Sequence, residues 1–140
     1  MTGSTQAAKR DYRSCSIEQL VAAFVAVSLE QSEALHDRKI VRYNRLYRDY
    51  AAIEEELKSR EGDQRRALRP LFDHINAQVR VNAAFSTLAV LPEEAKETLR
   101  LIHLRREYPQ AADAIGMLED IEKGRFIPDV GRVDLQGQQP

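Results

Sequence analysis

The chain of 140 residues is poor in several residue types, and each shortage excludes a class of protein. It has one cysteine, Cys15, so no intramolecular disulfide can form and the paired cysteines of zinc and redox sites are absent. It has no tryptophan and only 6% aromatic residues, which suits a helical protein better than a β-sandwich. The 21 basic residues are balanced by 22 acidic ones, and this disfavours wholesale nucleic-acid binding while allowing a local basic patch.

Long apolar runs are absent too. The longest, residues 20–29, is much shorter than the roughly 20 residues that span a membrane. Residues 1–15 lack the apolar core of a secretory signal. We therefore expect a cytoplasmic protein without a membrane partner. No motif indicates a metal ion or another cofactor.

Helical periodicity is what the sequence does contain. Ser16 and Gln19 form a capping-box pair at the start of the first predicted helix. Apolar spacing and end signals place six helices, at about 16–36, 38–61, 63–73, 77–91, 92–106 and 109–124. Short connections predict an all-α fold with six helices in three antiparallel pairs. We expect one domain over residues 14–130, between a flexible leader at 1–13 and a flexible tail at 131–140.

Glycine and proline mark the middle of the chain. Gly62 suits the left-handed position that follows a helix, and Asp63 suits the N-cap of the next one. Pro70 lies inside the third predicted helix. It removes a backbone donor and clashes with the preceding turn, which predicts a kink or a new helical start there.

The fourth predicted helix is the most apolar. Its run at residues 79–91 is apolar on nearly every side, so we expect neighbours to bury most of its surface, and Asn76 can cap its start. After Gly124 stops the last helix, Phe126 to Pro128 are expected to pack back as an extended segment.

A weak internal repeat is visible at a shift of 30 residues. The shift pairs Leu71 with Leu101, Phe72 with Ile102, Val81 with Ala111, Ala84 with Ala114, Phe85 with Ile115, Leu88 with Leu118, and Leu91 with Ile121. Amphipathic helices alone produce such matches, but helix–hinge–helix units at one period are also typical of an α-solenoid.

Specific motifs carry a family resemblance. The segment Leu68–His74, followed by Val79-Arg80, resembles a HEAT-type repeat, in which an Asp ends one helix and a Val-Arg pair opens the next. The second repeat departs from that pattern, with His103 opposite Asp73 and Gln110 opposite Arg80. Across residues 16–126 the chain is similar to a small bacterial family known as domain of unknown function twenty-nineteen. The resemblance is carried by SIEQLV, RYNRL, GDQRRALRPLFDH, QVRVNAA and EYPQAADA. It implies an ARM/HEAT-like α-α superhelix and no established activity.

Catalytic and metal sites have little support. Asp73 and His74 are adjacent, but no nucleophile or metal-ligand partner stands at a recognisable spacing, so Asp73 is better explained as a hinge residue that bonds backbone amides. The histidines lie far apart at positions 36, 74 and 103. Cys15 precedes a helix whose positive end would activate a thiol, although an apolar contact with Leu20 explains it more simply. We expect no enzyme activity.

The segment 38–48, RKIVRYNRLYR, is the strongest candidate for a binding surface. Its five basic residues, two tyrosines and lack of acid are typical of a nucleic-acid-binding helix. The candidate residues are Arg38, Lys39, Arg42, Asn44, Arg45 and Arg48. Asp49 joins their stripe one turn later, and Tyr43 lies on the apolar seam. These two details favour a solvated face that pairs with Glu30 and Glu33 across the helical turn.

Two features of the second helix leave alternatives open. Asn44 is either a polar contact in a groove or a buried amide bonded to backbone. Basic residues in the first half and Glu54 to Glu56 in the second half oppose the helix dipole, which reflects either a partner or tertiary ion pairs.

The leading hypothesis for function is a non-enzymatic protein–protein interaction module of helical-repeat type with an unknown protein partner. A bacterial toxin-neutralising or regulatory adaptor is one specific version of it. The alternative is nucleic-acid binding through the basic helix face at 38–48. Homo-oligomerisation is left open.

Overall fold

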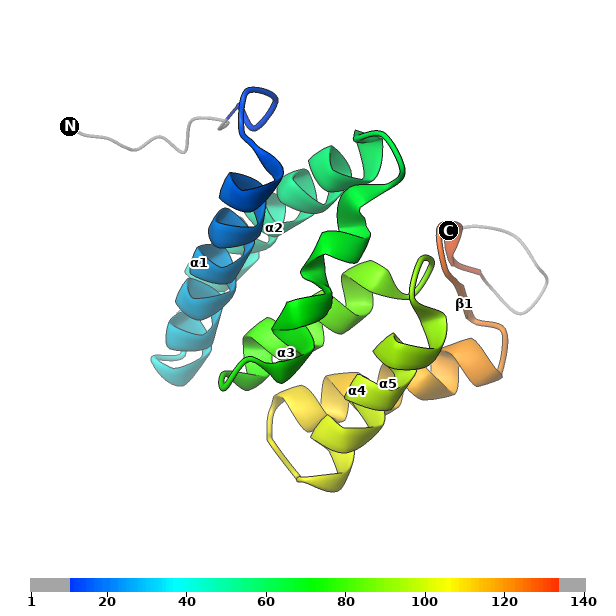
Figure 1. Ribbon diagram of the computed structural model, residues 1–140. Coiled ribbons are helices and arrows are strands. Elements are labelled where there is room, and N and C mark those ends of the chain that lie inside the picture. Colours follow the sequence, from blue (N-terminus) through cyan, green and yellow to red (C-terminus); the bar gives the residue numbers. More distant parts are fainter. Residues whose placement is uncertain (1–10, 134–140) are drawn as a thin grey trace. The chain divides into compact units, whose positions relative to one another are not determined.

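A computed structural model describes residues 11–133 of the chain. The described chain divides into two compact units, with the boundary between Gln64 and Arg65. The elements are α1 (Ile17–His36), α2 (Ile40–Ser59), the 3₁₀ helix η2 (Gln64–Asp73), α3 (Ala77–Thr87), α4 (Pro92–Leu104), α5 (Gln110–Glu122), β1 (Phe126–Ile127) and β2 (Gly131–Arg132) (Figure 1). The predicted all-α fold is confirmed, and the helices follow one another as predicted. The division into leader, single domain and tail stays a prediction, and residues 1–10 and 134–140 lie outside the described residues.

In the first unit, α1 and α2 lie side by side as an antiparallel hairpin (Figure 1). The predicted capping box at Ser16 is confirmed. The Gln19 backbone N–H donates to Ser16 Oγ at 3.0 Å, and the Ser16 N–H donates to Gln19 Oε1 at 2.8 Å. Two of the orphan donors at the start of α1 are thereby satisfied.

The hairpin turn has an unusual residue at its left-handed position. The Lys39 N–H donates to the Ala34 carbonyl at 2.7 Å and the Arg38 N–H donates to the Leu35 carbonyl at 3.1 Å, which is the Schellman pattern. Glycine is the usual residue at the left-handed position of this motif. Here Arg38 occupies it, with φ 58°.

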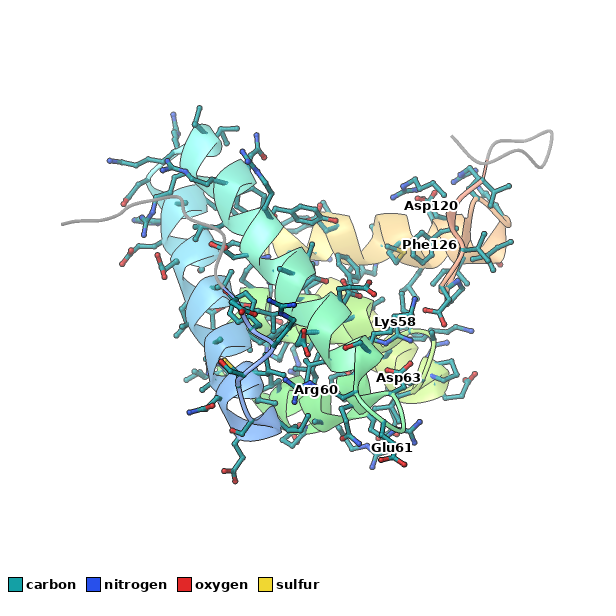
Figure 2. All side chains as sticks on the ribbon, turned by 90° about the horizontal axis from the view of Figure 1, so that it is seen from above. Lys58, Arg60, Glu61, Asp63, Asp120 and Phe126 are labelled. Carbon is teal, nitrogen blue, oxygen red and sulfur yellow. The ribbon has the colours of Figure 1, made fainter. Side chains whose placement is uncertain are left out.

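The apolar seam of α2 is confirmed at Leu46, Tyr50, Ile53 and Leu57, which are all buried, while Tyr43 is half-buried. The rings of Tyr50 and Phe24 are 5.4 Å apart between centroids. At the other end of the helix, labelled in Figure 2, the Arg60 guanidinium donates to the carbonyls of Tyr12 at 3.3 Å and Cys15 at 2.8 Å. Arg60 thus fastens the segment before α1 to the end of α2.

The link between the predicted second and third helices differs from the expectation. Gly62 does have a positive φ of 80°, but Asp63 is left-handed as well, with φ 54°, instead of the extended backbone of an N-cap. The helix over Gln64–Asp73 is a 3₁₀ helix. Pro70 lies inside it, and the missing donor and ring clash of a proline disfavour α-helical winding.

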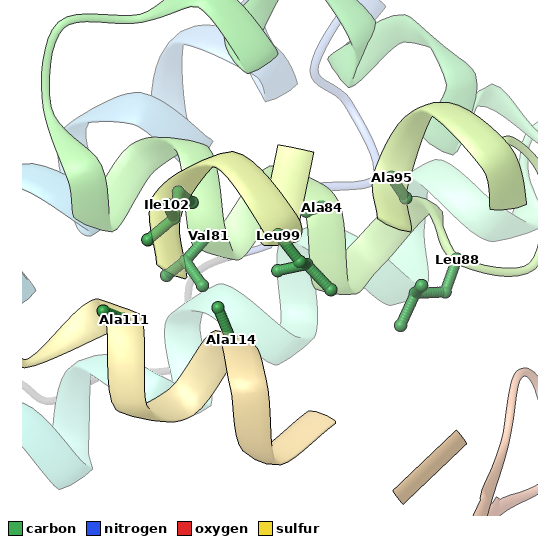
Figure 3. Packing of buried hydrophobic residues seen from close by; sticks show 8 residues of the cluster. All are labelled: Val81, Ala84, Leu88, Ala95, Leu99, Ile102, Ala111 and Ala114. Carbon is green, nitrogen blue, oxygen red and sulfur yellow. The ribbon is translucent and has the colours of Figure 1, made fainter. Parts of the chain in front are cut away.

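In the second unit, α3, α4 and α5 pack around one apolar cluster (Figure 3). Its buried members are Val81, Ala84, Leu88, Ala95, Leu99, Ile102, Ala111 and Ala114. Two repeat pairs from the sequence, Val81 with Ala111 and Ala84 with Ala114, belong to this cluster. The cap on α3 is confirmed, since Asn76 Oδ1 accepts from the N–H groups of Gln78 at 2.8 Å and Val79 at 3.1 Å.

The expectation that α3 is buried on most sides is also confirmed, because its residues are all buried except Ala77 and Phe85. Buried amides accompany its apolar residues. Gln110 on α5 donates to Gln78 at 2.9 Å, and Gln78 donates to Asn82 at 3.0 Å. These bonds satisfy polar groups that burial would otherwise penalise.

A short hairpin follows α5. As predicted, Gly124 ends the helix, with φ 75°, and Phe126 and Ile127 are extended and pair with Gly131 and Arg132. The Arg65 guanidinium donates to Asp129 at 2.9 Å and connects η2 to the hairpin turn. Asp120, labelled in Figure 2 near Phe126, accepts from Arg125 at 2.9 Å and also from Arg132.

Two further sequence expectations concern stacking and the membrane. The ARM/HEAT-like superhelical stacking of three helix pairs stays a prediction. Within residues 11–133, no helix combines the length and apolar character needed to cross a membrane.

Candidate functional site

The predicted basic surface lies at the start of α2 and on its outward face. Arg38 and Lys39 are exposed in the turn, and Lys39 is the N-cap residue of α2 without a side-chain cap bond. The first turn of α2 contains no acidic residue. The positive end of the helix dipole therefore stays uncompensated at its own terminus.

Arg42 pairs with the acidic residues of α1, as the solvated-face interpretation of this segment predicted. Its guanidinium donates to Glu30 at 3.2 Å and lies 3.5 Å from Glu33, both on α1. These carboxylates neutralise Arg42 and place two acidic residues beside the basic segment. Arg42 therefore contributes to holding the hairpin together and offers little free charge to a ligand.

Arg45 and Arg48 behave differently. Both are exposed, and among residues 11–133 neither side chain has a hydrogen-bond or ion-pair partner. Asn44 is exposed beside them, so the interpretation of Asn44 as a buried amide is wrong. The helical repeat places all three, together with Val41, on one outward face. The sequence pattern indicated these three polar residues, but it did not distinguish them from Arg42.

The apolar component of this surface was not predicted from the sequence. Val41 is 78% exposed, Ile40 55% and Tyr47 54%. We call Ile40, Val41, Asn44, Arg45, Tyr47 and Arg48 the basic–apolar face. Tyr47 also touches the core edge, where its ring lies 5.5 Å from that of Tyr50. Ile40 and Val41 could have indicated an exposed apolar surface from the sequence alone, because neither residue falls on the buried seam of the helix.

The Asp73–His74 pair has no catalytic arrangement. Asp73 is exposed at the end of η2, and the amides that it was expected to cap are bonded by Asn76 instead. The His74 ring nitrogen Nδ1 accepts from the Asn76 N–H at 3.0 Å. His74 therefore helps to shape the turn before α3.

Metal-binding groups and the thiol also give no site. Among residues 11–133, no three side chains of metal-binding type gather in one place. Cys15 is half-buried, and its carbonyl accepts from Arg60. A contact between Cys15 and Leu20 stays a prediction.

Arg80 makes a two-point ion pair with Glu107 in the second unit, which the sequence alone did not reveal. Its guanidinium donates to both oxygens of Glu107, at 2.6 and 2.8 Å, and to the carbonyls of His74 at 2.6 Å and Ile75 at 3.2 Å. The arginine holds the pKa of Glu107 below its usual 4.5, chiefly through these hydrogen bonds. The resemblance to a HEAT-type Val-Arg pair selected Arg80 but gave no partner for it.

A helical hairpin followed by a three-helix unit with a terminal β-hairpin defines the class of protein. The chain belongs to the family described as a domain of unknown function (DUF2019), which matches residues 18–122. It is similar to the crystal structure of the protein RPA1889 from Rhodopseudomonas palustris CGA009, with 45% identity and a TM-score of 0.84. That match covers 86% of this chain and 100% of the other. No curated protein matches the chain.

Proposed function

We propose that this protein is a non-enzymatic protein-binding module and that the basic–apolar face of α2 is its docking surface. The observation that carries the proposal is the exposure of Ile40 and Val41 beside Arg45 and Arg48, which have no counter-ion among residues 11–133. Burial of aliphatic side chains against a partner is favourable by about 25 cal/mol per Å² of apolar area. A partner that covers them would present apolar side chains together with carboxylates.

The same face distinguishes this proposal from nucleic-acid binding. The exposed aliphatic side chains of Ile40 and Val41 gain nothing from contact with phosphates, which supply most of the affinity for nucleic acid. Glu30 and Glu33 lie next to the segment and repel a polyanion. A nucleic-acid partner nevertheless stays the second candidate, because Arg45 and Arg48 have no ion-pair partner among the described residues. A toxin-neutralising or regulatory adaptor would be one form of the protein-binding module.

Site-specific crosslinking tests the proposal. A photo-crosslinking amino acid replaces Val41 in the full chain, and the adduct formed in the source cell is identified by mass spectrometry. The same residue in place of the exposed Glu119 on α5 is the positional control. We expect a discrete protein adduct from position 41 only, and binding of that purified protein to the wild-type chain.

Charge reversal then tests the arginines. Because neither side chain has a partner within the described part of the chain, Arg45→Glu with Arg48→Glu should keep the melting temperature. The double substitution should weaken partner binding by at least about tenfold, which corresponds to about 1.4 kcal/mol. Arg100→Glu with Lys123→Glu makes the same change in net charge at other exposed positions and should leave binding intact. Partner binding that survives the first pair contradicts the proposal. Salt-sensitive binding of RNA or DNA that the first pair abolishes, without a protein adduct, would support the second candidate instead.

A further inference from the structure

The turn between α4 and α5 forms an open pocket that lies entirely within the second unit. Its volume is about 460 Å³, and it is lined by His103, Leu104, Arg106 and Tyr108. Leu104 is 70% exposed and Tyr108 is 65% exposed. The pocket thus combines a cation, an imidazole and a phenol with apolar surface that water covers in the free protein.

The backbone places Arg106 in this pocket at an energetic cost. The Arg106 N–H donates to the His103 carbonyl at 3.0 Å and the Glu107 N–H donates to the Ile102 carbonyl at 3.3 Å, which is the Schellman pattern at the end of α4. Arg106 has φ 56°, a left-handed conformation that disfavours any side chain. At the end of α5, glycine occupies the equivalent position, with φ 75° for Gly124.

The charge of Arg106 is not neutralised within the described part of the chain. In residues 11–133 its guanidinium has no hydrogen-bond or ion-pair partner, although Glu107 is the next residue. Arg80 occupies both oxygens of that carboxylate, at 2.6 and 2.8 Å. Among the described residues that line the pocket, Arg106 carries the only permanent charge.

His103 adds a directed donor. Its Nδ1 is buried without a hydrogen-bond partner in the described residues. A proton at this position would be an unsatisfied buried donor, which is rarer in proteins than an under-used acceptor. We assign the proton of the neutral ring to Nε2, the nitrogen that remains available to a ligand.

We propose that this pocket binds the carboxylate or phosphate group of a small organic anion. The Arg106 guanidinium fork donates to two oxygens of the anion, as this geometry favours for both groups. His103 Nε2–H and the Tyr108 hydroxyl donate to the remaining lone pairs. Leu104 and the Tyr108 ring contact the apolar part of the ligand. The site lies outside the basic–apolar face and does not depend on the function proposed for α2.

Titrations followed by amide NMR test this site with three probes of similar shape. Benzoate carries a carboxylate, phenyl phosphate carries a phosphate, and benzyl alcohol is the neutral control. We expect at least one of the two anions to shift the amides of residues 103–108 in a saturable way, and benzyl alcohol to shift them weakly without saturation. The anion with the higher affinity identifies the group that the pocket prefers.

Variants of the left-handed arginines make the test specific. Arg106→Gly removes the guanidinium and also relieves the backbone, so the variant should fold at least as well as the wild type. It should weaken anion binding by about tenfold or more, because hydrogen bonds between charged groups are strong. Arg38→Gly makes the same change at the other Schellman turn with arginine, in the first unit, and should leave the affinity unchanged.

Three results would overturn the proposal. One is the absence of saturable shifts with both anions at tens of millimolar. Another is an equal response to benzyl alcohol, which would show an apolar site without anion selectivity. The third is unchanged affinity in Arg106→Gly. A melting curve recorded for every variant separates loss of binding from loss of fold.

Discussion

Arg80 at the start of α3 and Glu107 in the α4–α5 turn form a two-point ion pair across 27 positions of the chain, at 2.6 and 2.8 Å. The Arg80 side chain is 8% exposed and that of Glu107 is 28% exposed. The same guanidinium donates to the carbonyls of His74 and Ile75. One side chain therefore joins the turn before α3 to the turn before α5.

Removal of Arg80 should be strongly destabilising. Arg80→Ala leaves Glu107 and two carbonyls without their donor, and we expect the free energy of unfolding to fall by about 3 kcal/mol. Chemical denaturation measures this change. Arg100→Ala, which breaks the exposed pair with Glu97 at 2.9 Å, is the matched control and should change it by about 0.5 kcal/mol or less. A similar effect of both substitutions would show that the pair is no stronger than a surface ion pair.

The same pair predicts a dependence of stability on pH. Because Arg80 lowers the pKa of Glu107 in the folded state, the contribution of this carboxylate is fully present above its usual pKa of 4.5. The contribution is lost as the pH falls through the lowered folded-state value. The difference in unfolding free energy between the wild type and Glu107→Gln should thus be constant near neutral pH and shrink in acid. A difference that grows in acid would contradict this assignment.

Two arginines have a left-handed backbone conformation, and we expect glycine at either position to stabilise the fold. Arg38 and Arg106 have φ 58° and 56°, and replacement of either by glycine should raise the unfolding free energy by about 0.5 to 1 kcal/mol, net of the extra chain entropy of glycine. Lys123→Gly is the control, because the C-cap residue Lys123 has φ −90° and glycine relieves nothing there. Gly124→Ala, at φ 75°, should have the opposite sign and lower the stability by about 1 kcal/mol.

The uncapped start of α2 predicts a conflict between stability and binding. Lys39→Asp supplies an N-cap acceptor and a negative charge at the positive helix end, so stability should rise by about 1 kcal/mol at low salt. The same substitution removes a cation beside the basic–apolar face and should weaken binding of the partner identified by crosslinking. Thermal melting and a binding titration on one preparation measure both effects. Unchanged affinity in a stabilised variant would separate Lys39 from the docking surface.

Sequence patterns predicted those features of the fold that depend on neighbouring residues. Ser16 with Gln19, Asn76 and Gly124 marked helix ends correctly, since each bonds or constrains backbone within a few positions. The 3₁₀ winding around Pro70 was only partly foreseen. Proline excludes regular α-helix but does not say which alternative the chain adopts.

The residues of the candidate surface were predicted from the sequence, but which of its arginines form ion pairs was not. The segment 38–48 was selected for its arginines, yet Arg42 is paired with Glu30 and Glu33 while Arg45 and Arg48 are unpaired among the described residues. All three have the same side chain. Only the position of α1 beside α2 decides which guanidinium meets a carboxylate, and a linear pattern does not contain that distance.

The sequence by itself determined that this chain is a set of short amphipathic helices with defined ends, and that one of them is buried on nearly all sides. Tertiary structure alone decided which distant residues meet. The pairs Arg80 with Glu107, Gln78 with Gln110 and Arg65 with Asp129 are separated by 27, 32 and 64 positions. Helix ends depend on hydrogen bonds within one turn, which adjacent residues encode. Contacts across the fold depend on how whole apolar faces pack. That packing leaves Arg106 without a partner among residues 11–133, because Arg80 holds the neighbouring Glu107 carboxylate.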